Sequence, residues 1–373
     1  MNTTLPTDRW YEIQNPERVF SPGLVIYKDR IAENIRAMVE IAGDPKRLVP
    51  HVKTHKMAEV VQMQLDMGIT KFKCATIAEA ELLADCGAKW ILIAYQLVGP
   101  NVLRLSGLKG KYPDIHFASL VDSLESAQSL NAQAENSQAH VFIDVNNGMN
   151  RSGHPMDDAL LPLYKQIAKL PNLHLEGLHV YDGHIRDQDF AERKKHSDAD
   201  FAPVESLRDR LVTDGFPAPM IIAGGTPTFN VHALREGVYC SPGTCPLWDW
   251  GYGDRFLDQP FQHAALVATR VISKPTKGVI TVDLGHKAVA AENPIDRRFK
   301  LLNLENYEVQ SQSEEHGVVG VEDWDAVQIG DLLYALPYHI CPTVALHETA
   351  AVVENSQVVD EWEVRARRRR ITF

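Results

Sequence analysis

Residues 50–56 (PHVKTHK) hold the densest group of side chains that could do chemistry. They follow an apolar run and are expected to end a strand, where alternate side chains share a face, so Lys53 would lie beside His51 and His55. A lysine near cationic or partly buried groups can become a stronger nucleophile, as a lysine that forms a Schiff base must be. A surface cluster of histidine and lysine is the alternative, and this segment alone does not exclude it.

A second candidate pair lies near the C-terminus, in residues 337–344 (PYHICPTV). His339 and Cys341 are two positions apart and would point the same way on an extended strand. Imidazole and thiolate together favour zinc over magnesium or manganese, and two protein ligands leave positions open for water or a substrate. A lone His-x-Cys is a weak signal, and a pair without a metal is the alternative.

Residues 223–228 (AGGTPT) follow a late apolar strand. Gly224 and Gly225 let the backbone approach a phosphate, successive N–H groups can surround it, and the Thr226 hydroxyl adds a donor. Gly-Gly turns are common, but the end of a late barrel strand is where such barrels usually bind phosphate.

The elements that must position these groups form a regular alternation. From about residue 22 to 250, short apolar runs such as 24–27, 48–52, 90–94 and 140–145 alternate with amphipathic helical segments. About eight strand–helix units in succession favour a (β/α)8 barrel of the TIM type over an open doubly wound sheet. In such a barrel the functional side chains lie at the C-terminal ends of the strands.

After about residue 260 the pattern changes to alternating β segments separated by Gly, Pro and Asn, which predicts a C-terminal all-β domain. We therefore expect a barrel domain over residues 20–257 and a β domain over residues 258–373 that carries the metal pair. Residues 1–19 are a candidate addition to the β domain.

The composition is that of a soluble globular chain, with 45% hydrophobic and 23% charged residues. A net charge of −11 argues against a nucleic-acid or membrane-surface role. The chain has no apolar run long enough to span a membrane, and its first residues lack the pattern of a signal peptide. Five scattered cysteines without a Cys-x-x-Cys fit a reducing compartment, so we expect the cytoplasm.

Two segments resemble a known family: residues 21–26 (SPGLVI) and 49–56 (VPHVKTHK) resemble the D-threonine aldolase and D-serine dehydratase family. The resemblance runs from about residue 20 to 365. It implies the alanine-racemase-like barrel of fold type III pyridoxal-phosphate enzymes, with the cofactor on the first lysine of the segment. That lysine is Lys53, with His51 beside the cofactor, and Lys56 is not the attachment point.

Further segments match the same family. Residues 144–153 (DVNNGMNRSG) resemble its Asp-Val-Gly-Met-Gly-Arg-Cys-Gly segment, which assigns Arg151 to the phenolic side of the cofactor. Residues 177–184 (GLHVYDGH) resemble a strand end with Tyr-x-Gly-His, so Tyr181 is a candidate partner of the pyridine ring and His184 a candidate base. The Gly-Gly-Thr match assigns Gly224, Gly225 and Thr226 to the phosphate.

The resemblance also implies a divalent metal on His339 and on the residue two positions later. That residue is expected to be Asp in the aldolases and Cys in the dehydratases, and here it is Cys341. Zinc is favoured, with manganese or magnesium as alternatives. The flanking residues 342–348 (PTVALHE) look aldolase-like, so we favour cleavage of a β-hydroxy D-amino acid to glycine and an aldehyde. The base would be metal-bound hydroxide or a histidine such as His184 or His55.

Three alternatives stay open. A D-serine dehydratase would use nearly the same site to form a keto acid and ammonia. An amino-acid racemase would need a second base, for which Tyr252, Tyr307 and Tyr338 are candidates. A pyridoxal-phosphate homeostasis protein shares the barrel but lacks the β domain. By analogy with this fold we expect a homodimer.

Overall fold

The computed structural model describes residues 9–134 and 138–373. The chain divides into two compact units. Within the described residues, the barrel unit comprises residues 37–53, 61–134, 138–243 and 368–373, and the β unit comprises residues 9–36, 54–60 and 244–367. No helix in the described part of the chain combines the length and the apolar character that crossing a bilayer requires.

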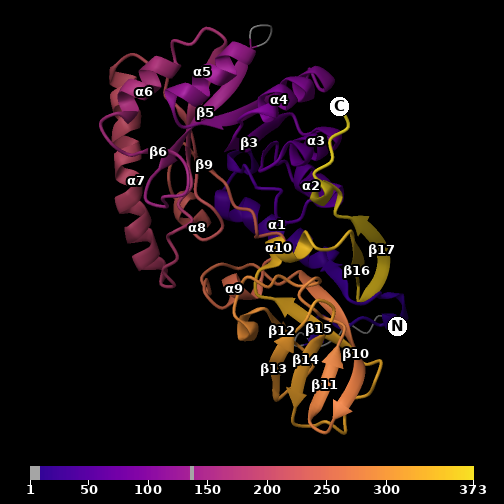
Figure 1. The fold of residues 1–373 in the computed structure, drawn as a ribbon. Coiled ribbons are helices and arrows are strands. Elements are labelled where there is room, and N and C mark those ends of the chain that lie inside the picture. Colours follow the sequence, from indigo (N-terminus) through magenta and orange to yellow (C-terminus); the bar gives the residue numbers. More distant parts are fainter. Residues whose placement is uncertain (1–8, 135–137) are drawn as a thin grey trace. The chain divides into compact units, whose positions relative to one another are not determined.

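Seven strands of the barrel unit are parallel and follow one another in chain order (Figure 1). They are β2 (Lys71–Cys74), β3 (Trp90–Gln96), β4 (His116–Val121), β5 (Ala139–Asn146), β7 (Leu173–Val180), β8 (Met220–Ala223) and β9 (Val238–Cys240). Leu48 pairs with Cys240 and His51 pairs with Lys73, both in parallel. The segment before Lys53 therefore closes the sheet into an eight-membered barrel, and the short strand β6 (His154–Pro155) pairs with β5.

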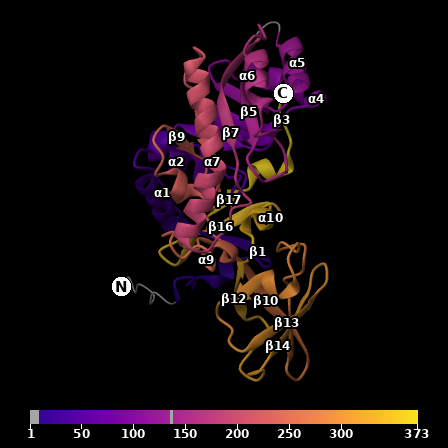
Figure 2. The same ribbon diagram turned by 90° about the vertical axis from the view of Figure 1, so that its left-hand side faces the viewer.

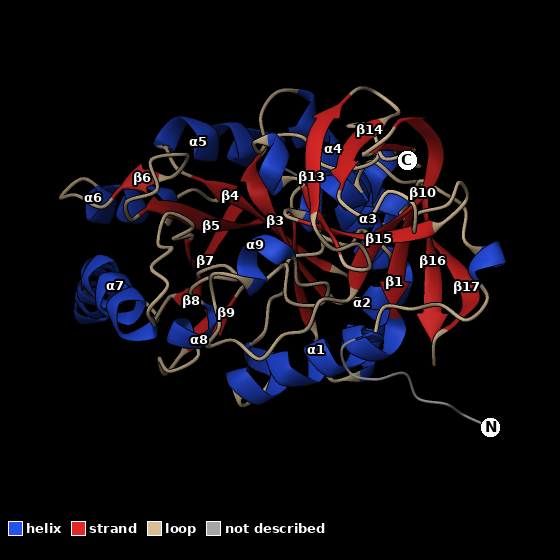
Figure 3. Cartoon of the chain, turned by 90° about the horizontal axis from the view of Figure 1, so that it is seen from below, coloured by secondary structure: helices blue, strands red, loops and turns tan. Residues whose placement is uncertain are grey.

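Helices lie on the outside of these strands (Figure 3). They are α3 (Ile77–Asp85), α4 (Pro100–Lys111), α5 (Leu124–Gln133), α6 (Leu160–Ile167), α7 (Phe190–Thr213) and α8 (Phe229–His232), while α1 (Lys28–Ala42) and α2 (Ala58–Asp66) run across the division between the units. Figure 2 shows α7 as the longest helix, and the Asp189 side chain caps its N-terminus. Inward-facing side chains from neighbouring strands, such as Leu92, Leu120 and Phe142, pack together and fill the barrel interior.

The β unit contains a nine-stranded, mostly antiparallel sheet in the order β13-β14-β11-β10-β1-β16-β17, with β15 joining β10 to β12. Its strands are β1 (Gly23–Tyr27), β10 (Ala265–Thr276), β11 (Val279–Val282), β12 (Phe299–Leu301), β13 (Tyr307–Gln312), β14 (Gly317–Val321), β15 (Leu332–Pro337), β16 (Thr349–Glu354) and β17 (Gln357–Glu363). Its helices are α9 (Trp250–Gly253) and α10 (Ile340–Val344). The expected barrel with a separate β domain is thus the observed fold.

The division of the chain differs in detail from the sequence expectation. Strand β1, expected to open the barrel, pairs with β10 and β16 and belongs to the β unit. A short apolar strand satisfies either sheet, and the pattern does not reveal its partner. Residues 244–257 also group with the β unit, and residues 368–373 group with the barrel unit.

The N-terminal segment is held by the β unit where the structure describes it. Tyr11 donates to Leu302 O, and Ile13 N donates to the Tyr334 hydroxyl. Residues 1–8 of the expected 1–19 addition lie outside the described residues.

Candidate active site

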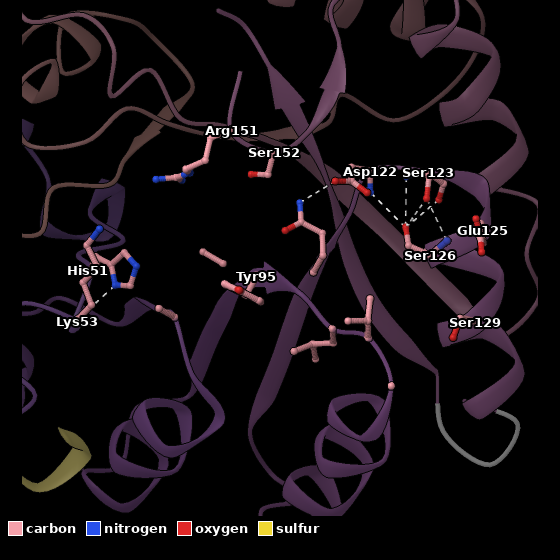
Figure 4. Close-up of a pocket in the computed structure, with 16 residues that line it drawn as sticks. His51, Lys53, Tyr95, Asp122, Ser123, Glu125, Ser126, Ser129, Arg151 and Ser152 are labelled. Atoms are coloured by element: carbon pink, nitrogen blue, oxygen red, sulfur yellow. Dashed lines mark hydrogen bonds between the residues drawn. The ribbon is translucent and has the colours of Figure 1, made fainter. Parts of the chain in front are cut away.

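Lys53 lines a cavity of about 960 Å³ in the barrel unit. The cavity lies where β3, β4 and β5 end, because Gln96, Asp122 and Arg151 on its wall close or follow these strands. Figure 4 shows His51, Lys53 and Arg151 toward one end and the serines at the start of α5 toward the other. The structure therefore brings together three of the side chains singled out in the sequence.

The backbone around Lys53 is fixed by its neighbours. Lys53 N donates to His51 Nδ1 at 3.3 Å, and Val52 N donates to Lys73 O at 2.9 Å. His51 N donates to Pro242 O at 2.8 Å. These bonds hold Lys53 at the barrel mouth and leave the long side chain to reach the cavity.

A second lysine, Lys73, lies inside the barrel beside Lys53 and was missed in the sequence. It is almost fully buried on β2, with Nζ 3.5 Å from His179 Nε2 and 5.8 Å from the centroid of the Tyr181 ring. Burial, followed by the charge of Lys53, lowers the pKa of Lys73 to about 7. Its only signal in the sequence is a charged residue at an inward position of an apolar strand.

Replacing Lys73 by methionine is expected to stabilise the protein without cofactor by up to about 4 kcal/mol near pH 7. In the unfolded chain the Lys73 amine binds a proton readily, whereas burial in the folded chain makes the protonated amine unfavourable. This cost is complete below about pH 7 and shrinks toward zero as the pH approaches the ordinary lysine pKa. Denaturant unfolding of both proteins at pH 6.5 and 9.5 measures it, and an equal gain at both pH values would contradict this origin.

Tyr181, at the end of β7, packs between cations. The Arg151 guanidinium lies 4.7 Å from the centroid of its ring. Gly225 lies on another side, since a Cβ there would come within 2.8 Å of the Tyr181 ring. Tyr181 thus connects Arg151 with the Gly-Gly loop, although neither Tyr181 nor that loop lines the cavity.

His179 is a satisfied buried histidine. Its Nδ1 donates to Asp144 Oδ1 at 2.7 Å, and Asp144 Oδ2 also accepts from Gln96 and Ser152. Burial acts against ionisation of Asp144, but these bonds outweigh it and lower the pKa of Asp144 below its ordinary value. Asp144 therefore remains an anion among Lys53, Lys73 and Arg151.

The loop of Gly224 and Gly225 is held by a buried carboxylate, Asp182. Asp182 accepts from Thr228 Oγ1 at 2.7 Å and from His232 Nε2 at 2.8 Å. Gly224 has φ +75°, and a Cβ there would lie 2.5 Å from the His232 ring, so only glycine fits. No motif or spacing in the sequence indicated the role of Asp182.

Thr226 and Ser241 complete this end of the barrel. Thr226 Oγ1 accepts from Gly243 N at 3.1 Å. Ser241, directly after β9, is 3% exposed, and within the described chain its hydroxyl has no hydrogen-bond partner. A buried hydroxyl without a partner is costly, so this position suits a polar ligand.

The two candidate bases lie in different surroundings. His184 Nε2 lies 2.8 Å from Asp200 Oδ2 on α7, and His184 does not line the cavity of Lys53. His55, in the β unit, is 1% exposed, and its Nδ1 accepts from Met57 N. His55 Nε2 is buried and has no partner among the described residues, and burial lowers the pKa of His55 to about 3.

His339 and Cys341 lie at the start of helix α10 and not on an extended strand. Strand β15 ends at Pro337, His339 precedes the helix with extended backbone angles, and Cys341 is in the first turn. Asp249 fixes this turn, since its Oδ2 accepts from Ile340 N at 3.1 Å. The expectation of a shared strand face was therefore wrong. The proline at position 342 does not prevent the helix, because proline is tolerated in the first turn of a helix.

The side chains around this pair restrict its chemistry. Cys341 Sγ lies 3.2 Å from Thr54 Oγ1 and 3.6 Å from Thr244 Oγ1. His339 Nδ1 lies 2.6 Å from Glu292 Oε1, which leaves Nε2 as the ring atom for a ligand. Burial lowers the pKa of His339, but the bonds to Cys341 and Glu292 outweigh it and raise this pKa to about 9.

The fold and the lysine at the barrel mouth define a class of protein. Residues 26–245 match the alanine racemase N-terminal domain, and residues 264–353 match the putative serine dehydratase domain. The chain is thus an alanine-racemase-like barrel protein with a dehydratase-type β domain.

Relatives over the whole chain define the family. D-threonine aldolase from Arthrobacter sp is 30% identical, with 94% of this chain and 93% of the relative covered. 3-Hydroxy-D-aspartate aldolase from Paracoccus denitrificans (strain Pd 1222) is 28% identical over 93% and 92%, and D-threo-3-hydroxyaspartate dehydratase from Delftia sp. is 24% identical over 92% and 96%. The solved D-threonine aldolase from Filomicrobium marinum has a TM-score of 0.86 at 25% identity over 95% and 98%. The chain belongs to the D-threonine aldolase and D-serine dehydratase family, whose members depend on pyridoxal phosphate.

Proposed function

We propose that this protein is a pyridoxal-phosphate- and metal-dependent lyase that cleaves β-hydroxy D-amino acids to glycine and an aldehyde. The observation that carries the proposal is the 30% identity to a D-threonine aldolase over nearly the full length of both chains. That alignment spans the lysine-bearing barrel unit and also the β unit with His339 and Cys341.

The barrel residues suit pyridoxal phosphate. Lys53 would hold it through the ε-amino group, with His51, Arg151 and Tyr181 against the ring. Gly224, Gly225 and Thr226 would bind the phosphate, and the Ser241 hydroxyl, which has no partner among the described residues, would be a further donor for it. The positive charges of Lys53, Lys73 and Arg151 fit the anionic phosphate and the carboxylate of an amino acid.

The residues of the β unit suit a divalent metal. His339 would bind through Nε2 while Glu292 holds Nδ1, an arrangement that is usual for metal-ligating histidines. Thr54 and Thr244 can donate to a Cys341 thiolate, and Thr54 directly follows Lys53 in the chain. Imidazole with thiolate favours zinc, and manganese or magnesium are weaker candidates.

Bound pyridoxal phosphate would withdraw electrons from the Cα of the substrate. The side chains of the protein orient the substrate and move protons. Lys53 is the amine at the cavity and can carry a proton to or from Cα. His55 stays neutral at physiological pH, so its unpaired Nε2 can accept a hydrogen bond from the β-hydroxyl. His184 is the other candidate for this contact, because its Nδ1 is likewise buried and without a hydrogen-bond partner among the described residues.

The deciding experiment for the reaction is product analysis. The protein is incubated with D-threonine, D-serine and D-3-hydroxyaspartate in the presence of pyridoxal phosphate and zinc. Glycine with the matching aldehyde is expected. Keto acid with ammonia would overturn aldol cleavage in favour of the dehydratase, and racemisation of D-alanine would favour a racemase.

The second candidate, a D-serine dehydratase-like elimination, is favoured by one feature, the cysteine at position 341. The racemase is weakened at one of its candidate bases, because the Tyr307 hydroxyl accepts from Leu301 N at 2.6 Å and its ring packs on the β-unit core. The homodimer remains a proposal by analogy with this fold. The cytoplasm remains a proposal from the five free cysteines.

Replacing Glu292 by glutamine is expected to weaken zinc binding about 10- to 100-fold, because the carboxylate that orients His339 is lost. Zinc titration of the metal-stripped protein, followed by activity and by calorimetry, measures the change. Glu314→Gln is the matched control, since Glu314 is an exposed carboxylate of the same unit that pairs with Lys287. Equal zinc affinity in the Glu292 variant and the control would contradict the assignment.

A further inference from the structure

Two histidines and a glutamate meet at the N-terminal end of the barrel strands, away from the strand ends that line the cavity of Lys53. His116 opens β4, His140 is the second residue of β5, and Glu176 lies in β7. His116 Nε2 lies 2.6 Å and His140 Nδ1 2.7 Å from the same oxygen, Glu176 Oε1. The three atoms therefore converge on one point.

The strand register produces this convergence. His140 pairs with Ala118, two residues after His116, so both histidines point to the same side of neighbouring strands. Between β5 and β7 the register shifts from Val141 with Leu175 to Phe142 with Gly177. Glu176 is thus the extra residue of a β-bulge, a feature that redirects a side chain. The flat face of Trp90 stacks on His116 and holds its ring.

The three atoms are buried, and their close contacts are ion-pair distances without the geometry of a hydrogen bond. His116 Nε2, His140 Nδ1 and Glu176 Oε1 have almost no accessible surface, and among the described residues none has a hydrogen bond of acceptable geometry despite the short distances. Other histidine–carboxylate pairs of the unit differ, because His179 with Asp144 and His184 with Asp200 form well-directed hydrogen bonds. Two imidazole nitrogens and one carboxylate oxygen thus gather within reach of a single point, which is the arrangement that a divalent cation requires of its ligands.

We propose that His116, His140 and Glu176 form a second divalent-metal site of the zinc type, separate from His339 and Cys341. Two imidazoles and one carboxylate are a common zinc ligand set, and water would supply the fourth position. Tetrahedral ligands about 2.1 Å from zinc are about 3.4 Å apart, so each contact to Glu176 would open by about 0.7 Å. The side chains are partly exposed, which gives an ion a path from the N-terminal face.

The site has a structural role. It adds a side-chain link between β4, β5 and β7 to the backbone ladders that already join these strands at this end of the barrel. Residues at the N-terminal face of such barrels serve stability, whereas chemistry takes place at the opposite face. Zinc bound to His116, His140 and Glu176 is therefore expected to raise the Tm of the protein and to leave its catalytic activity unchanged.

The test uses the full chain with His339→Gln and Cys341→Ser, which removes the other metal pair. After dialysis against zinc and then metal-free buffer, one zinc per chain is expected by elemental analysis, with Tm about 5 °C above the stripped protein. Cobalt in place of zinc is expected to give visible bands without the near-ultraviolet thiolate band, because no sulfur is a ligand. No retained zinc and no Tm rise would overturn the proposal.

A further variant locates the ion. Adding His140→Gln to that background is expected to abolish zinc retention, while circular dichroism and cofactor binding stay normal. Should His140→Gln fail to fold, His116→Gln in the same background gives the same test. His174→Gln is the matched control, since its exposed ring lies next to His140 but outside the three-ligand group. Zinc retention that survives both site variants, or is lost in the control alone, would overturn the assignment.

Discussion

Lys53→Ala is expected to lower kcat/KM for cleavage of β-hydroxy D-amino acids at least about 10³-fold, since it removes both the amine that holds the cofactor and a proton carrier at Cα. The visible absorbance of covalently held pyridoxal phosphate is expected to disappear, although the Gly-Gly loop can still bind the phosphate. Steady-state kinetics and absorbance spectra of the purified variant measure both effects.

The matched control is Lys56→Ala, three residues along the same segment. Lys56 is expected to be dispensable, so the control keeps its absorbance and its kcat/KM within about twofold. Loss of the absorbance in the Lys56 variant and its retention in the Lys53 variant would reverse the assignment.

Cys341→Ala is expected to lower activity about 100-fold or more and to weaken zinc binding while the cofactor remains attached. The two threonine hydroxyls that face Cys341 Sγ would lose their partner, and His339 alone holds a metal weakly. Activity, metal content and cofactor absorbance are measured on the same sample. Full activity in this variant after chelation would contradict a metal role for the pair.

The variant Cys341→Asp distinguishes two roles of Cys341, a metal ligand or a thiol that serves only the structure. Aspartate is the residue expected here in aldolases, and its oxygen suits manganese and magnesium better than a thiolate does. This variant is expected to recover activity with manganese while it loses its preference for zinc. Cys86→Ala, in the barrel unit, is the control and is expected to behave like the unmodified protein.

The alternation of apolar strands and amphipathic helices was sufficient to predict the barrel, because parallel strands buried on both faces leave a strong pattern. Strand β1 was expected in the barrel but lies in the sheet of the β unit. The apolar residues of a short strand do not indicate which strand it will pair with. Two isolated bridges close the barrel. Leu48 pairs with Cys240, nearly 200 residues further along the chain, and His51 pairs with Lys73 through a single residue pair. A local sequence pattern records neither contact.

The candidate site divides in the same way. Lys53, His51 and Arg151 carry motif signals and do line one cavity. Lys73 and Glu292 carry none beyond residue type, because their roles come from burial and from a partner distant in sequence. The geometry of His339 and Cys341 was mispredicted, since spacing by two fits both an extended strand and a first helical turn.

Chemical reduction of the bond between pyridoxal phosphate and its lysine tests the assignment of Lys53 most sharply. The protein with bound pyridoxal phosphate is reduced with borohydride and digested, and its peptides are mapped by mass spectrometry. The reduced cofactor is expected on the peptide of Lys53 alone. Its attachment to Lys56 or to the neighbouring buried Lys73, or no attachment at all, would contradict the role of Lys53 as the cofactor lysine.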